Sequence, residues 1–331
     1  MLLIVLLLYC SCTKNFLDQI PNKQKVVPAS LSDLQAMLDN DSKMNTGYPS
    51  AGEEASDNGW VDNATWQALP YLTFKNIYIW DENVFSDIDR NDWSNPYIKI
   101  LYANICLEGV NQITPSTGIL SDWQNVKGSA LFYRSWCFWN LAQEFAKLYD
   151  HATAPTDPGI VLKLSSDINN RDIRSSVQET YDQMIADAKE SLLLLPATSP
   201  IIKSRPSKAA AYGLLSRIYL SMRKYPEAGL YADSCLQLNS TLLNYNTLSA
   251  TATNPVKRYN TEVVFHSIGN STNTFFTTAR YRADSNLYKT YNSNDLRKTI
   301  FFKIVTAPNI VSYYGSYDGT NSPFNGIATD E

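Results

Sequence analysis

Excess positive charge and long apolar runs are both missing from this sequence. Lys and Arg total 28 against 32 Asp and Glu, so the formal net charge is −4 and no cationic surplus is available for a phosphate backbone. We therefore expect no nucleic-acid partner. The apolar run at residues 2–8 is too short to cross a bilayer as a helix.

Motifs for catalysis, cofactors and metals are also missing. The two histidines, His151 and His266, lie in unrelated contexts, and the sequence has no glycine-rich phosphate loop, nucleophile elbow or C-x-x-C spacing. Residues 87–91 resemble the opening of a calcium loop, but Asp92 replaces its turn glycine and Ile98 its closing glutamate. These absences predict a protein that is not an enzyme and holds neither metal nor cofactor. A carboxylate pair for glycoside hydrolysis leaves no sequence motif, because the separation of its two groups is a spatial quantity.

A signal peptide and a lipid anchor are predicted at the N-terminus. Residues 2–8 suit the core of a signal peptide, and Cys12 follows it behind a small residue, where bacterial lipoproteins are cleaved and acylated. We predict a signal peptide at 1–11 and membrane attachment through a lipidated Cys12; an ordinary cleaved signal or a core cysteine is the alternative. The thiols in later apolar segments are expected in the core: Cys106, Cys137 and Cys235.

Helical periodicity dominates the middle of the chain. Two segments repeat each other, so that Ser135 and Phe138 match Ser216 and Tyr219. A small residue three positions before a large ring lets a second helix approach closely. Each copy is followed by a second segment whose apolar or small residues recur at helical spacing. This pattern predicts two tetratricopeptide-like helix pairs. The first joins helix 128–149 to a helix capped by Ser176, and the second joins helix 208–222 to a helix that resumes at Ala228.

Shorter elements are predicted around these pairs. A helix at 31–38 starts behind Ser30, and another covers 97–108, whereas residues 44–94 are rich in loops and tryptophan. Beyond residue 240, short strands at 263–265 and 301–305 are expected among long loops.

Taken in order, several segments resemble the SusD/RagB family of nutrient-binding outer membrane lipoproteins. The resemblance begins at a mature N-terminus and continues through an early helical region, tetratricopeptide helices and the approach to a last helical pair. These segments are 12–18, 54–57, 95–104, 134–149, 176–196, 208–228, 294–298 and 326–331.

The resemblance implies a mainly α, SusD-like fold with tetratricopeptide-type helix pairs, long loops and a few short strands. It implies a tether at 12–30, a helical N-terminal region at 31–240, and the start of a loop-rich C-terminal region at 241–331 that is expected to be incomplete. It also implies an outward-facing, lipid-anchored protein of the outer membrane that delivers a nutrient, commonly a glycan, to a SusC-like TonB-dependent transporter.

Aromatic side chains are the candidate ligand-binding residues. The sequence contains 21 Tyr and 7 Trp against 12 Phe, and Tyr and Trp combine a flat apolar face with a hydrogen-bonding edge, as a sugar ring requires. Trp60, Trp66 and Trp80 fit this role best; the alternative is that they pin loops to the core. Trp136 and Trp139 lie within a helix and are expected in the core. A secreted glycan-degrading enzyme and a tetratricopeptide scaffold for protein partners remain alternative functions.

Overall fold

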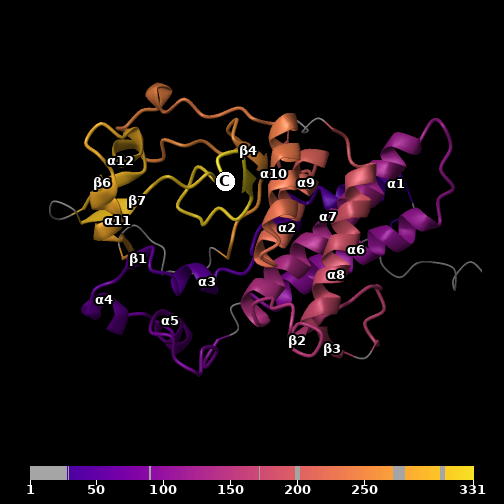
Figure 1. Ribbon diagram of the computed structural model, residues 1–331, viewed down its shortest axis with the longest axis horizontal. Coiled ribbons are helices and arrows are strands. Elements are labelled where there is room, and N and C mark those ends of the chain that lie inside the picture. Colours follow the sequence, from indigo (N-terminus) through magenta and orange to yellow (C-terminus); the bar gives the residue numbers. More distant parts are fainter. Residues whose placement is uncertain are drawn as a thin grey trace, which may run out of the picture.

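Helices α6 (Ser94–Asn111), α7 (Leu120–Phe145), α8 (Val177–Leu194), α9 (Lys208–Ser221) and α10 (Tyr225–Leu238) lie together on one side of the molecule (Figure 1). Several short helices and strands, among them α4, α5, α11, α12, β6 and β7, lie on the other side (Figure 1). The computed structural model describes residues 28, 30–88, 91–170, 172–197, 202–270, 280–305 and 310–331. The predicted signal peptide, Cys12 and most of the predicted tether lie outside these residues. The mainly α fold class expected from the sequence is confirmed.

The helices differ widely in length. They are α1 (Leu31–Leu38), α2 (Asp41–Met44), α3 (Ala51–Glu54), α4 (Asn63–Gln67), α5 (Leu72–Tyr78), α6 (Ser94–Asn111), α7 (Leu120–Phe145), α8 (Val177–Leu194), α9 (Lys208–Ser221), α10 (Tyr225–Leu238), α11 (Ser285–Thr290) and α12 (Leu296–Ile300), with a 3-10 turn at Tyr245–Thr247.

The described strands form two-stranded antiparallel sheets. These pair β1 (Gly59–Trp60) with β5 (Arg282–Ala283), β2 (Pro158–Val161) with β3 (Arg174–Ser176), β4 (Val263–Phe265) with β8 (Ile327–Ala328), and β6 (Phe302–Ile304) with β7 (Val311–Tyr313). Strands β4 and β6 lie where the apolar runs predicted them. Helices α11 and α12 were not predicted, because five or six residues are too few to show a helical period.

The two predicted helix pairs are present. Helix α7 packs against α8, α9 packs against α10, and α8 joins the two pairs. The repeated serines make the same contact in both pairs: the Ser135 hydroxyl donates to the Met184 carbonyl at 2.8 Å, and the Ser216 hydroxyl donates to the Ala228 carbonyl at 3.0 Å. In each pair, the close approach of the two helices is therefore accompanied by a hydrogen bond between them.

The predicted bounds of the first long helix, 128–149, are wrong at both ends. The helix begins at Leu120, where polar residues hid the pattern, and the Trp123 indole donates to the Val110 and Ile113 carbonyls at the end of α6. It ends at Phe145, and the chain then turns so that Tyr149 packs on Tyr181 of α8 with 5.0 Å between ring centroids.

The helix N-caps predicted at Ser30 and Ser176 are confirmed. Ser30 and Asp33 form a capping box at α1, and Ser176 and Glu179 form another at α8. The tryptophan-rich stretch predicted as loops, residues 44–94, contains α3, α4 and α5, helices of four to seven residues that are too short for a sustained period.

A buried ion pair ties the central helices together. Arg134 of α7 donates from Nε and Nη2 to the Asp187 carboxylate of α8, both at 2.7 Å, and from Nη1 to the Asn104 side chain of α6 at 2.9 Å. The Asn104 amide donates in turn to the Lys163 and Ser165 carbonyls at 3.0 Å. One guanidinium thus links three helices and, through Asn104, the loop that follows β2.

The C-terminal half is attached to α7 by apolar packing. Phe265 of β4 is fully buried and lies edge-on to Phe132 and Trp136, with centroid distances of 4.7 and 5.7 Å. Gly213 of α9 faces β8, where an added Cβ would lie 2.6 Å from Ile327 Cγ2, so a glycine is needed for this approach. The helical body therefore fixes the position of the β4–β8 pair.

Removing the buried cation should destabilise the fold strongly. Arg134→Met leaves the Asp187 carboxylate buried without its partner, so we expect the free energy of unfolding to fall by about 3–5 kcal/mol in urea denaturation. The double variant Arg134→Met with Asp187→Leu should recover most of the loss, because no uncompensated charge remains.

Lys147→Met provides the control. Lys147 pairs with Asp157 at 2.6 Å, but 68% of its side chain is exposed, so its removal should leave stability close to that of the wild type. Equal losses for Arg134→Met and Lys147→Met would contradict this interpretation.

Candidate functional site

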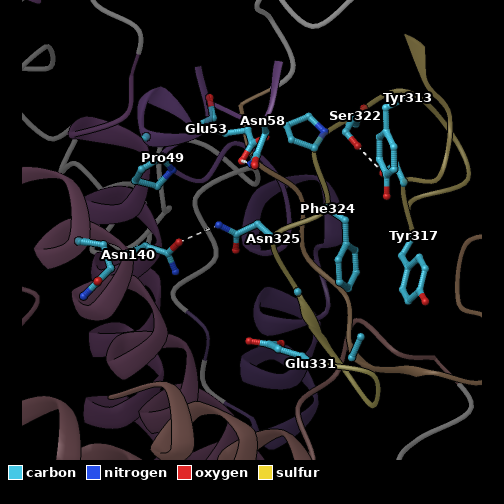
Figure 2. Close-up of a pocket in the computed structure, with 18 of the residues that line it drawn as sticks. Pro49, Glu53, Asn58, Asn140, Tyr313, Tyr317, Ser322, Phe324, Asn325 and Glu331 are labelled. Atoms are coloured by element: carbon cyan, nitrogen blue, oxygen red, sulfur yellow. Dashed lines mark hydrogen bonds between the residues drawn. The ribbon is translucent and has the colours of Figure 1, made fainter. Parts of the chain in front are cut away.

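A cavity of about 930 Å³ lies where the helical body meets the C-terminal segments. The ends of α7 and α9 form one side, residues 49–58 contribute to the rim, and residues 281–331 supply most of the opposite wall. Figure 2 shows Glu53 and Asn58 at one end of the cavity and Glu331 at the other. The site therefore joins residues that are far apart in the sequence.

One wall of the cavity is aromatic. Figure 2 shows the rings of Tyr313, Tyr317 and Phe324 across the cavity from Asn140 and Asn325. Tyr317 and Phe324 have ring centroids 5.6 Å apart. The single proton of the Tyr317 hydroxyl is shared between Asp330, at 3.0 Å, and buried Glu262, and burial raises the Tyr317 pKa. This phenol is therefore neutral at physiological pH and holds its ring in a fixed position.

The facing wall carries side-chain amides held by hydrogen bonds. Asn325 Nδ2 donates to Asn140 Oδ1 at 2.8 Å, and Asn140 Nδ2 donates to the Trp136 carbonyl at 2.8 Å (Figure 2). The Ser267 hydroxyl donates to Asn325 Oδ1 at 3.1 Å. These bonds fix both amides at the junction between α7 and the C-terminal segment.

Arg217 of α9 binds the C-terminal segment to the helices. Its guanidinium forms an ion pair with Glu331 and donates to the Asn325 carbonyl at 3.2 Å and to the Gly326 carbonyl at 2.6 Å. It also lies over the rings of Trp136 and Trp139, at 5.3 and 5.5 Å from the centroids. The side chain closes one end of the cavity.

The three predicted ligand tryptophans have different surroundings. Trp80 is 77% exposed, has a left-handed backbone with φ of 58°, and donates from its indole nitrogen to the Ala55 carbonyl at 2.8 Å. Trp66 is half-buried against a small cluster of Val61, Leu69 and Phe74 and donates to the Lys75 carbonyl at 3.2 Å.

Trp60 is also half-buried and lies in β1, where its backbone pairs with Arg282. Within the described ranges, none of the three tryptophans lines the cavity. Trp80 is nevertheless attached to the rim segment, because Ala55 directly follows α3.

One known protein family matches more than half of this chain. A SusD-like family model, described as starch-binding and associating with the outer membrane, matches residues 15–220. This chain belongs to the SusD-like family. No protein of curated function matches the sequence. Over the stretches that the structure describes, no helix combines the length and apolar character needed to cross a membrane.

Solved structures share the SusD-like fold at low sequence identity. A SusD superfamily protein of Bacteroides vulgatus ATCC 8482 has a TM-score of 0.72 and 15% identity over 91% of this chain and 73% of its own. One from Bacteroides thetaiotaomicron VPI-5482 has a TM-score of 0.68 and 16% identity over 88% and 72%. A laminarin-binding SusD-like protein has a TM-score of 0.60 and 18% identity over 88% and 70%.

The expectation that both helical tryptophans are core residues is wrong for Trp139. Trp136 is fully buried, but Trp139 is half-buried and lines the cavity. Its ring stacks on Trp136 at 5.5 Å, and its indole nitrogen donates to the Ser221 hydroxyl at 3.3 Å. The residues of α7 on both sides of Trp139, polar ones included, are buried, so no change of sequence pattern marks the boundary between core and cavity.

The other wall residues were not identified from the sequence. Tyr313, Tyr317, Phe324 and Asn325 lie in a region that we interpreted only as short strands and loops. Their spacing carries no motif, because β6, β7 and β8 have two or three residues each. The number of tyrosines was the only available signal.

The resemblance to a calcium loop falls partly on residues 89 and 90, which lie outside the described ranges. Asp87 accepts hydrogen bonds from the Leu72 and Thr73 amides at the start of α5, and these bonds lower its pKa. Among the described residues, no group of three His, Cys, Asp or Glu side chains is placed to hold a metal ion.

Arg217 should control how firmly the C-terminal wall is closed. Arg217→Met removes charged hydrogen bonds to residues 325, 326 and 331, so we expect amide exchange at Asn325 and Thr329 to accelerate about tenfold. Hydrogen–deuterium exchange measures this directly.

Lys224→Met is the matched control, because it removes an exposed cation that follows the same helix. Unchanged exchange in Arg217→Met, or equal acceleration in the control, would contradict the assigned role.

Proposed function

We propose that this SusD-like protein binds a glycan at the cell surface and passes it to a SusC-like TonB-dependent transporter. The observation that carries the proposal is Trp80, a large aromatic ring that is exposed and held in place. Membership of a family described as starch-binding supports the ligand class, and the name of the laminarin-binding relative agrees with it.

Trp80 has the properties of a stacking platform for a sugar ring. Most of its surface is open to solvent, while its hydrogen bond to the Ala55 carbonyl fixes the orientation of the indole. A left-handed backbone is unfavourable for a bulky residue, and such strain is concentrated at functional positions. A fixed ring loses little conformational freedom when a ligand covers it.

The cavity would provide the groups that a single ring lacks. Glu53 and Asn58 line the cavity in the same rim segment that holds Trp80 through Ala55. Amides and carboxylates bind sugar hydroxyls, and further aromatic rings cover the apolar faces of sugars. A glycan chain would then contact both the exposed ring and the cavity.

Trp66 and Trp60 remain proposed ligand residues with a smaller share of the contact. Both are half-buried, and Trp66 packs on its own apolar cluster. Their substitution is expected to affect the local fold as well as binding.

Localisation follows from the family and from the predicted anchor. The family description places its members at the outer membrane. We propose that acylation of Cys12 attaches the protein there in an outward-facing orientation, with the helix pairs against the transporter.

Two other functions make different predictions. A glycan-degrading enzyme would turn over polysaccharide and lose turnover when one Asp or Glu is changed. A tetratricopeptide scaffold would retain its ligand after substitution of Trp60, Trp66 or Trp80. The cavity and the exposed ring favour binding over both alternatives.

Trp80→Ala should weaken glycan binding without unfolding the protein. Calorimetry with maltoheptaose and laminariheptaose should show affinity reduced about tenfold for whichever is bound, as expected for losing one apolar stacking surface. The thermal midpoint should change little, because the side chain is mostly exposed.

The neighbouring Ile79→Ala is the matched control, since it also removes an exposed apolar side chain. Equal affinity in Trp80→Ala and the wild type would contradict the assigned role, and hydrolysis of either oligosaccharide by the wild type would favour the enzyme.

Cys12→Ala should release the protein from the membrane. Expressed in a bacterium with an outer membrane, the variant should lose labelling by radioactive palmitate and leave the membrane fraction, because acyl chains need the thiol. Cys10→Ala, two positions away in the predicted signal peptide, should keep both properties. Palmitate labelling of Cys12→Ala would refute the anchor.

A further inference from the structure

The charged groups around the cavity are strongly one-sided. Its acidic lining residues are Glu53, Glu144, Asp330 and Glu331, whereas Arg217 is the one basic lining residue among those that the structure describes. A ligand in this cavity therefore meets a field set mainly by carboxylates.

Arg217 is already committed to partners within the protein. Its Nε and Nη2 atoms bind the Glu331 carboxylate, and the same guanidinium donates to the Asn325 and Gly326 carbonyls. A ligand carboxylate or sulfate that bound this cation through two hydrogen bonds would have to displace Glu331, because four of the five N–H groups of Arg217 already have acceptors. One anion would replace another, and Glu331 would be left beside the ligand without its ion pair.

Two of the other carboxylates, Asp330 and Glu53, accept hydrogen bonds from neutral side chains, and burial raises the pKa of Glu53. Asp330 accepts from the Tyr317 hydroxyl at 3.0 Å, and Glu53 accepts from the Asn58 amide at 3.0 and 3.1 Å. Such oxygens are strong acceptors for the hydroxyl groups of an uncharged sugar. They repel a sugar that carries its own negative charge.

We infer that this cavity selects uncharged glycans and rejects those bearing carboxylate or sulfate groups. The inference rests on the proposed function and names the ligand class of the same site. Its physical basis is Coulomb repulsion from the carboxylates of the lining, since Arg217, the one basic residue in the described part of that lining, is already paired with Glu331. At about 6 Å in water, one such repulsion weakens binding about threefold, so two or more together reach about tenfold.

Matched oligosaccharides test the selection. Maltoheptaose and laminariheptaose are each compared by calorimetry with the same chain oxidised at C6 to the uronate. At low ionic strength, we expect the neutral member of a bound pair to bind at least about tenfold more tightly, and the difference to shrink in high salt.

A charge-removal variant assigns the effect to the cavity. Glu53→Gln combined with Asp330→Asn preserves side-chain size and should narrow the difference between neutral and oxidised ligands several-fold. The control, Glu227→Gln with Asp233→Asn, removes the same charge from exposed positions on α10 outside the cavity and should leave the difference unchanged.

The outcomes separate the two proposals. Binding of the oxidised chains as tightly as the neutral ones would overturn the selection but leave glycan binding intact. An unchanged preference in the Glu53/Asp330 variant would overturn its assignment to these carboxylates. Failure of all four oligosaccharides to bind would overturn the proposed function and the selection with it.

Discussion

The enclosure of α7 determines where the other elements can lie. From Val126 to Ala142, every side chain of this helix is buried except Lys127 and Trp139. Such a helix must be covered on all faces, and α6, α8 and β4 provide the cover. Because the buried surface includes Arg134, the same packing requires Asp187 and Asn104 opposite its guanidinium. The stack of helix pairs is therefore built around one long helix and one satisfied charge.

The cavity follows from how the C-terminal segment meets this body. Apolar packing of Phe265 and Ile327 fixes β4 and β8, but beyond them the wall is held by Arg217 and by the Asn140 to Asn325 contact. Asn140 and Arg217, at the ends of α7 and α9, are thus held by hydrogen bonds, whereas the opposite wall comes from loops and very short strands. Loops in such a wall can change in sequence with little effect on the helices that support them.

Local signals explain which parts of the fold were predictable. Ser135 and Ser216 marked helix contacts, and Ser176 with Glu179 marked a helix start, because the partners of these groups lie nearby or repeat along the sequence. Tyr317 and Asn325 could not be assigned in this way, since their partners, Glu262 and Asn140, lie 55 and 185 positions away. Helices of four to seven residues also escaped detection, because they are shorter than two turns. The helical platform was thus predictable, and the wall of the cavity was not.

Trp66 and Trp80 show why residue type alone could not separate a proposed ligand residue from a packing residue. Both indoles donate to a backbone carbonyl, but Trp66 also packs in an apolar cluster, whereas Trp80 is largely exposed. The left-handed backbone at Trp80 costs about 1–2 kcal/mol for a residue with a side chain. A ring that stabilises the fold offsets such strain through the apolar surface that it buries, but the Trp80 ring is mostly exposed and buries little. Contact with a ligand would supply the missing burial, which is why the exposed indole, rather than the better packed one, carries the functional argument.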